Sequence, residues 1–235
     1  VDQLIKNLSD PNEWVVRKSR RRLQELISRE SKSSSLRNSD SESDDLSSLK
    51  NHPWIQKFQN AFELAGDTKT KLRITWASYS CFPDQESWLL NRLSESNEHL
   101  RAWAVRLLTD GRISISNPGL ERILETAKED ESGLVRLYLA GSIPRFTPEF
   151  GHRLAAELAT RSQDAEDRTQ PKLIWYGYEP IANLLPHRAI DLAFDSHIPL
   201  LTQNIARRLT FNIQTEPEIV DKLTVQLKGA ERDKI

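Results

Sequence analysis

The strongest constraint on the fold of this chain is a short phrase that recurs along it. An aliphatic residue followed by arginine occurs at Val16-Arg17, Leu72-Arg73, Leu100-Arg101 and Val135-Arg136. Successive arginines are 56, 28 and 35 residues apart, and the long first interval contains a Ser-rich insertion. A period of about 28–38 residues, with one helical hairpin per period, is typical of repeat arrays. One hairpin cannot bury its own apolar face, so neighbouring hairpins must stack.

Between these phrases the sequence predicts one helix after another. Asp10, Asp67 and Asn97 are placed to cap helix N-termini, and Gly66 is placed to supply a left-handed C-cap. Eight Gly in 235 residues are fewer than a sheet protein with many tight turns needs. We therefore expect an all-α fold, a right-handed α-solenoid of about six HEAT-like helical hairpins. The expected helices cover 2–7, 11–28, 52–65, 68–79, 83–93, 98–108, 117–127, 134–143, 148–159, 171–181, 186–194, 196–210 and 216–228.

One segment differs from the rest in composition. Half of the residues from Ser31 to Ser48 are Ser, acids are clustered there, and no apolar periodicity is visible. Such a segment has too little to bury, so we expect a disordered linker. The expected organisation is an N-terminal hairpin at 1–30, a linker at 31–50, a repeat array at 51–213 and a C-terminal helix and tail at 214–235.

Charge and composition exclude several classes of protein. Lys and Arg number 33 against 34 Asp and Glu, so strong bulk attraction to nucleic acid or anionic lipid is not expected. No apolar run approaches the length of a membrane span, and mean hydropathy is −0.59. The single Cys81 excludes an internal disulfide. Because the chain begins with Val and contains no Met, we expect it to be a piece of a longer protein.

The turn phrase Asp10-Pro11 followed by Val16-Arg17 resembles a HEAT repeat. In that family a turn Asp and an Arg of the second helix usually form a ladder between adjacent repeats. The resemblance implies a structural role for Arg73, Arg101 and Arg136.

Longer phrases resemble a more specific family. They are DPNEWVVR (10–17) with RRRLQE (20–25), EHLRAWAVRLL (98–108) with VRLYLA (135–140), and LIWYGYEP (173–180) with IPLL (198–201) and IARRL (205–209). Together they are similar to the helical-repeat section of PVC-type membrane-bound dehydrogenase/cytochrome proteins of bacteria, from Asp10 to Leu209 without the Ser-rich insertion. The resemblance implies a β-propeller dehydrogenase-like domain before this section, a c-type cytochrome after it and a periplasmic or cell-envelope location. With one Cys and no CxxCH motif, this segment is expected to hold no cofactor.

Few residues form patterns that support chemistry. None of the five histidines has a His or Cys partner at helical metal-site spacing, so surface or capping roles are expected. Cys81, near the end of an apolar helix, is expected to be a buried, inert thiol. Asp164, Glu166 and Asp167 are expected to be solvated loop charges. The alternative, a weak cation site, lacks the full acid pattern of a calcium loop.

The aromatic phrase at 175–180 is the strongest candidate for a binding site. Gly177 allows close approach of another segment, and Pro180 is expected to kink or end the helix. Core packing is one interpretation. The other places a buried Glu179 opposite arginines on the inner face of the array. The candidate binding residues are Arg101, Trp103, Arg136, Tyr138, Trp175, Tyr178, Glu179, Arg207 and Arg208.

Two functional hypotheses follow. The first is a non-catalytic scaffold that binds a protein partner or neighbouring domains of the same chain, within a larger redox protein. The second is a DNA-base glycosylase of the helical-repeat type, which Trp103, Trp175, Arg106 and Arg136 would serve. The balanced net charge disfavours the second, because a DNA-wrapping solenoid needs a basic inner stripe. The basic run RKSRRR at 17–22 is interpreted as a solvated helix face.

Overall fold

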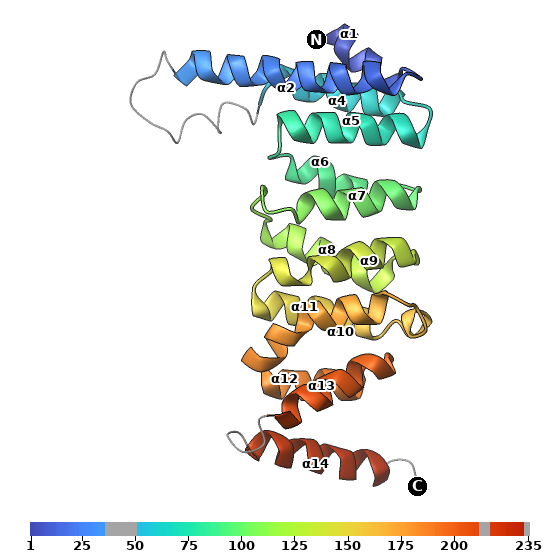
Figure 1. The fold of residues 1–235 in the computed structure, drawn as a ribbon, viewed down its shortest axis with the longest axis vertical. Coiled ribbons are helices and arrows are strands. Elements are labelled where there is room, and N and C mark those ends of the chain that lie inside the picture. Colours follow the sequence, from blue (N-terminus) through green and yellow to red (C-terminus); the bar gives the residue numbers. More distant parts are fainter. Residues whose placement is uncertain (36–50, 212–216, 233–235) are drawn as a thin grey trace. The chain divides into compact units, whose positions relative to one another are not determined.

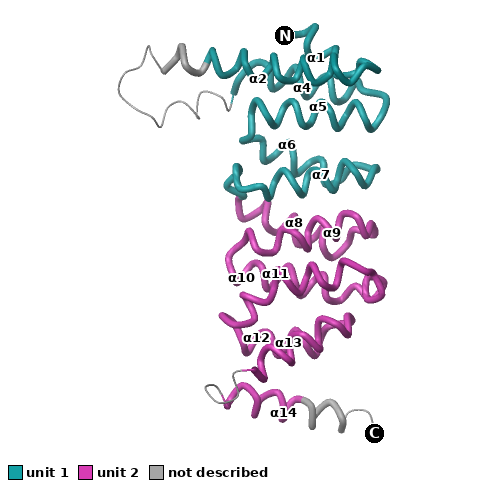
Figure 2. The backbone as a smooth tube through the Cα atoms, viewed as in Figure 1, with its two compact units in different colours: residues 1–115 teal, residues 116–235 magenta. Residues whose placement is uncertain are grey.

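The computed structural model describes residues 1–35, 51–211 and 217–232, with side chains described to 30 in the first stretch and to 226 in the last. All regular structure in these stretches is helical, as the sequence predicts (Figure 1). The expected linker at 31–50 begins within a helix that continues to Ser35, and its residues 36–50 lie outside the described part. The chain divides into two compact units, unit 1 at 1–115 and unit 2 at 116–235, each described separately below (Figure 2).

Unit 1 contains α1 (Asp2–Lys6), the 3-10 turn η1 (Asn7–Ser9), α2 (Glu13–Ser35), α4 (Pro53–Leu64), α5 (Thr68–Cys81), α6 (Glu86–Arg92) and α7 (Glu98–Leu108). Consecutive helices pack as the pairs α4 with α5 and α6 with α7, while α5 also contacts α2 on one side and α7 on the other. Aromatic side chains fill the core on the α4 side. Phe58 and Phe62 are fully buried, and the Phe62 ring meets Trp88 of α6 edge-on at 5.6 Å.

Unit 2 contains α8 (Asn117–Glu129), α9 (Gly133–Ser142), η2 (Ile143–Arg145), α10 (Pro148–Ala159), η3 (Ser162–Asp164), α11 (Gln170–Leu184), α12 (Pro186–Asp195), α13 (Pro199–Phe211) and α14 (Pro217–Arg232). Two layers of helices are present within it. In one layer α10 contacts α8 and α12, and in the other α11 contacts α9 and α13. The buried aliphatic residues between the layers include Ile123, Leu139, Leu154, Ile174 and Ile205.

Side-chain caps begin several helices, and two of the three predicted caps are confirmed. Asp67 accepts from the Thr70 amide at 2.9 Å, and Asn97 accepts from the His99 amide at 3.0 Å. The prediction for Asp10 is wrong. The helix begins two residues later than a cap at Asp10 requires, because Asn12 accepts from the Trp14 amide and Asp10 instead accepts from the Asn12 amide. Asp10 therefore shapes the turn before the cap.

Helix ends show two further corrections. Gly66 does not have the predicted left-handed conformation. The cap residue that follows α4, Ala65, has an extended backbone, and among the described residues only Gly111 has a positive φ, of 92°. The predicted start of the following helix pair, at Pro83-Asp84, is too early, because α6 begins at Glu86. The buried Gln85 before it is held by Ser78 and the Phe82 carbonyl.

The Gly177–Pro180 part of α11 confirms one prediction. A Cβ atom on Gly177 would lie 2.9 Å from Cβ of Ile143, so glycine permits the predicted close approach. Pro180 does not end the helix, which continues to Leu184. Proline has no amide hydrogen, so it cannot bond the carbonyl four residues earlier, that of Tyr176. Pro180 and Tyr176 are both exposed, which places this carbonyl on the solvent side of α11.

Candidate functional site

The predicted binding residues do not form one described cluster. Arg101 and Trp103 belong to unit 1, and the other seven belong to unit 2. Within unit 2, Tyr138 on α9 and Trp175 on α11 are half-buried, whereas Arg207 on α13 is exposed. The contacts of the remaining residues show what each does in its own unit.

Arg136 is a buried structural arginine. Its guanidinium is held by Asp164 through two bonds, Nε to Oδ2 at 2.5 Å and Nη2 to Oδ1 at 2.6 Å. A third bond joins Nη1 to the Asp130 carbonyl at 2.8 Å, and the Gln170 amide donates to the same carboxylate at 3.1 Å. The network ties α9 to the turn before α11, and we call it the Arg136 clasp. Such fork-to-fork pairs fix geometry as well as adding energy.

The Arg136 clasp corrects the prediction for Asp164, which was expected to be a solvated loop charge. Its side chain is only 7% exposed, whereas Glu166 and Asp167 of the same turn are exposed as predicted. The reason is the buried guanidinium, because a buried charge is tolerated when it is paired and hydrogen-bonded. Asp167 accepts from the backbone amides of Thr169 and Gln170 and so organises the start of α11.

Glu179 is not the buried acid that the sequence predicted. Its side chain is 46% exposed, and its ion pair with Arg208 is long, at 3.8 Å. Next to it on α11, Tyr178 is fully buried, and its hydroxyl lies 2.9 Å from Nδ1 of His152. Burial raises the pKa of Tyr178 above its usual range. Burial also lowers the pKa of His152, and the positive charge of Arg188 lowers it further. Both rings therefore stay neutral near pH 7 and join α10 to α11.

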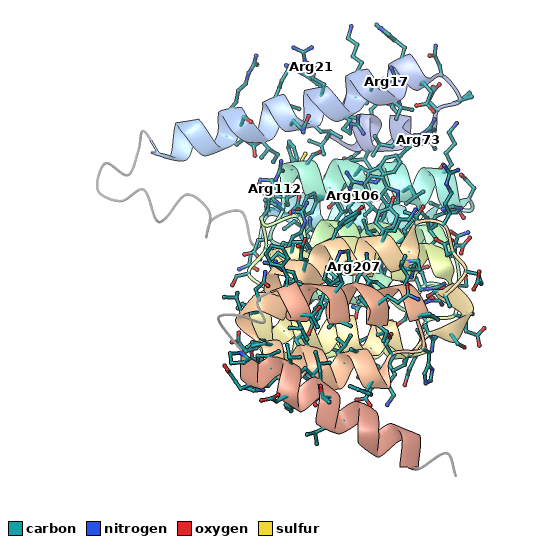
Figure 3. The ribbon with its side chains drawn as sticks, turned by 60° about the horizontal axis from the view of Figure 1, so that its bottom comes forward. Arg17, Arg21, Arg73, Arg106, Arg112 and Arg207 are labelled. Atoms are coloured by element: carbon teal, nitrogen blue, oxygen red, sulfur yellow. The ribbon has the colours of Figure 1, made fainter. Side chains whose placement is uncertain are left out.

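In unit 1, Arg101 donates to the carbonyls of Glu95 and Ser96 at 2.8 and 3.0 Å, at the turn before its own helix. Trp103 lies edge-on to Trp76 of α5, with ring centroids 4.8 Å apart, and Arg106 lies over the Trp103 ring at 5.1 Å. Figure 3 labels Arg106 together with Arg17, Arg21, Arg73 and Arg112 of this unit. Trp76 and Trp103 are only half-buried, so this aromatic pair forms part of the surface of unit 1.

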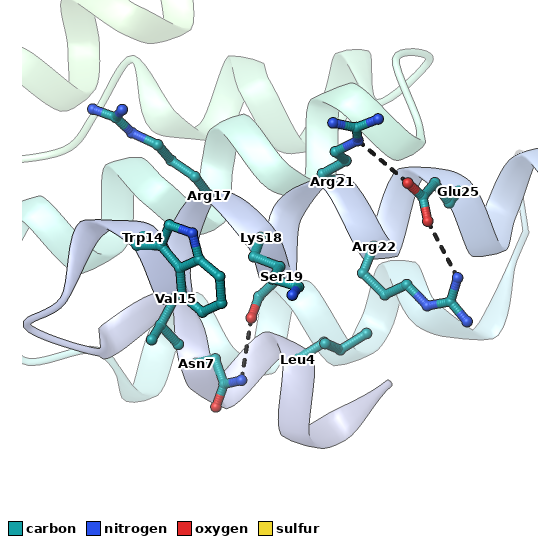
Figure 4. A pocket seen from close by; sticks show the side chains of 10 residues that line it. All are labelled: Leu4, Asn7, Trp14, Val15, Arg17, Lys18, Ser19, Arg21, Arg22 and Glu25. Carbon is teal, nitrogen blue, oxygen red and sulfur yellow. Dashed lines mark hydrogen bonds and ion pairs between the residues drawn. The ribbon is translucent and has the colours of Figure 1, made fainter.

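A basic surface on α2 was not among the predicted sites. We define the α2 basic surface as Trp14, Arg17, Lys18, Arg20, Arg21 and Arg22. On one side it borders a hollow of about 830 Å³, whose wall is completed by Leu4 and Asn7 (Figure 4). Trp14 is 64% exposed, with the Lys18 ammonium 4.6 Å from its ring centroid. The hollow therefore combines an accessible aromatic ring with cations.

A second hollow, of about 580 Å³, lies where α2 faces α5. Val16, Leu72 and Trp76 supply its apolar lining, and Arg17, Arg20 and Lys69 supply its cations. Arg17 lines both hollows, so the two meet at this side chain, whereas Arg20 lines only the smaller one.

The cations of the α2 basic surface differ in how they are compensated. Arg21 and Arg22 both pair with Glu25, at 3.3 and 3.2 Å. Arg17 and Arg20 form no ion pair with any residue in the described ranges. The sequence contained the signal for this surface, because RKSRRR follows Trp14 and places Lys18 one helical turn from that ring. What the sequence could not show was the pair of hollows.

The remaining reactive groups are held in unreactive states. Cys81 is buried, and burial raises the pKa of its thiol to about 12, as expected for an inert cysteine. Tyr79 is also buried, and its hydroxyl donates a hydrogen bond to Asp110. Burial and this bond both raise the pKa of Tyr79. Within the part of the chain that the structure describes, no group of three or more His, Cys, Asp or Glu side chains could hold a metal ion.

Comparison with known proteins adds no relative: no protein-family model, curated protein or solved structure matches the chain. In the three described stretches, no helix combines the length and apolar character needed to cross a membrane.

Proposed function

We propose that this chain is a non-catalytic interaction module, built as an array of HEAT-like helical hairpins, that binds a protein partner. The observation that carries the proposal is the use made of its buried charges. Arg73 donates to two backbone carbonyls of the turn before α2. Arg136 donates to Asp164 and to one backbone carbonyl in the turns beside α9. Buried charge here organises turns between helices, which is the role expected in an array whose function is to present surface.

The hairpin pairing supports the finer statement about architecture. Within unit 2 the helices alternate between two layers, and within unit 1 α5 contacts both α2 and α7. In such an array each hairpin is stabilised mainly by its neighbours. Hydrogen exchange in the native state tests this: the proposed array opens hairpin by hairpin from its ends, whereas one cooperative opening of all helices would contradict it.

The resemblance to PVC-type dehydrogenase/cytochrome proteins supports a second part of the proposal, that the module belongs to a larger bacterial redox protein. Its support is the set of phrases at 10–17, 20–25, 98–108, 135–140, 173–180, 198–201 and 205–209. Reading the coding sequence on both sides of this chain tests it. A β-propeller before the chain and a CxxCH motif after it are expected, and unrelated flanking domains would contradict this part alone.

A DNA glycosylase remains the rival function, and Trp103 with Arg106 over its ring is the observation that favours it. The test is release of damaged bases from duplex DNA, measured with the native chain and with the Trp103→Ala variant. Arg136→Ala is unsuitable because Arg136 is buried in the clasp. Base release that is lost in Trp103→Ala would overturn the interaction module.

The direct test of the interaction module is affinity capture of the tagged chain from the organism that encodes it, with nuclease treatment. We expect one protein to remain bound at a fixed ratio after the nucleic acid is removed. Capture of nucleic acid alone, or of nothing by a correctly folded chain, would contradict the proposal.

A further inference from the structure

We propose that the α2 basic surface is a docking site for a short acidic segment of a protein partner, one that carries a large apolar side chain. This inference rests on the proposed interaction function and adds the chemistry of what is bound. It follows from three properties of the surface: its uncompensated charge, its apolar lining and its length.

The charge of α2 calls for an acidic occupant. From Glu13 to Glu30 the helix carries six Lys and Arg against three Glu. Glu13 is already bonded by Arg73 and Lys69, and Glu25 by Arg21 and Arg22, so these acids leave Arg17 and Arg20 without partners in the described residues. Carboxylates on a partner would supply the bidentate acceptors that a guanidinium fork prefers.

The apolar lining calls for a large apolar side chain among the acids. Leu4, Trp14 and Val15 line the larger hollow, and Trp14 presents its ring to solvent. Tryptophan and arginine are among the residue types enriched at the energetic centres of protein interfaces. An aromatic or aliphatic side chain entering this hollow would cover the Trp14 ring, while its acidic neighbours reach Arg17, which lines both hollows, and Arg20, which lines the smaller one.

The length of the surface fits a short extended segment. Residues 14 to 25 of a helix span about 17 Å at 1.5 Å per residue. An extended peptide covers that distance with about five residues. Two or three acids flanking one apolar residue would therefore engage the whole surface.

Acids among the lining residues favour a peptide over nucleic acid. Glu25 lines the larger hollow and Glu13 the smaller one. A continuous phosphate backbone would pass both carboxylates, whereas a peptide can place its acids at Arg17 and Arg20 and leave a neutral residue beside each Glu.

Fluorescence anisotropy with a labelled peptide of about nine residues, acidic with one central Phe, tests the proposal. The key variant is Arg17→Gln/Arg20→Gln. Its matched control is Arg122→Gln/Arg153→Gln, which removes the same charge from cations paired with Glu125 and Glu121 in unit 2. We expect the key variant to weaken binding about tenfold or more and the control to change it less than about twofold.

A second pair of variants tests the apolar part. Trp14→Ala should weaken binding of the Phe-containing peptide several-fold and leave a peptide with Ser in place of Phe unaffected. Tyr176→Ala, at an exposed aromatic residue of unit 2, is the control. Circular dichroism and the unfolding midpoint of each variant establish that the fold is retained.

Three results would overturn the docking site. These are no binding of the acidic peptide by the native chain, equal losses in the two double variants, and tighter binding of a single-stranded oligonucleotide of equal charge. If the tagged chain still captures a protein after nuclease treatment, such a result removes the docking site alone. If that capture fails as well, the interaction module is also wrong.

Discussion

Two buried arginines that follow an aliphatic residue in the recurring phrase, Arg73 of unit 1 and Arg136 of unit 2, hold turns in different ways. Both side chains are at most 6% exposed. Arg73 donates to the carbonyls of Leu8 and Asp10 and pairs with Glu13, whose side chain is 50% exposed. Arg136 donates to one carbonyl and pairs with Asp164, which is 7% exposed. The comparison shows that the arginine of one recurring phrase can be hydrogen-bonded mainly by backbone carbonyls in one unit and by a buried acid in the other.

The largest effect is expected from Asp164→Ala. It leaves the Arg136 charge buried without its acid, and removing one partner of a buried ion pair costs about 3–5 kcal/mol. Hydrogen exchange measured by mass spectrometry should show the loss in unit 2 peptides. Glu166→Ala, at an exposed acid of the same turn, should change stability by less than about 0.5 kcal/mol. Equal effects of the two substitutions would contradict the clasp.

A smaller effect is expected from Arg73→Met. It removes the donors to the Leu8 and Asp10 carbonyls, and the lost bonds should destabilise unit 1 by about 1–3 kcal/mol. Glu13→Gln should destabilise the protein clearly less than Asp164→Ala. When the half-exposed Glu13 is replaced, Arg73 can still bond solvent and the two carbonyls. Denaturant unfolding of both variants measures this. A Glu13→Gln loss as large as that of Asp164→Ala would remove the distinction between the two arginines.

These two arginines also show which features of the structure can be predicted from the sequence. Helix periodicity is a local property, and it predicted an all-helical chain. The structural roles of Arg73 and Arg136 were expected from the resemblance of the turn phrase to a HEAT repeat. Neither signal could identify Asp164, which is 28 residues from Arg136 in the sequence and belongs to a turn whose other acids are exposed. The α2 hollows were missed for the same reason: they require α1 and α5 to lie beside α2, and no local pattern encodes that packing.

The units should also differ in their response to acid. His152 has its pKa lowered from 6.5 by burial and by Arg188, against the opposing charge of Asp191. Its neutral form is favoured by folding, so this contribution is complete above about pH 6.5 and is lost as the pH falls below it. In unit 1, the bond from Arg73 lowers the pKa of Glu13 from 4.5, so that contribution is lost only below about pH 4.5.

Hydrogen exchange in each unit between pH 7.5 and 5.5 measures the difference. Unit 2 should weaken over this range and His152→Gln should remove part of the change, while the Arg73 region of unit 1 should stay constant. A parallel decline of both regions that His152→Gln leaves intact would show that His152 is not responsible.

The smallest effect is expected at Glu179, the acid that the sequence proposed as buried. Glu179→Gln removes one half-exposed carboxylate at 3.8 Å from Arg208, and exposed ion pairs contribute about 0–1 kcal/mol. The loss should therefore be less than about 0.5 kcal/mol, and raising the salt concentration should abolish it. Unfolding curves of Glu179→Gln and Asp164→Ala, recorded side by side, compare the predicted acid with the observed one. A larger loss at Glu179 would mean that the aromatic phrase of α11, and not the turn before it, holds the charge on which unit 2 depends.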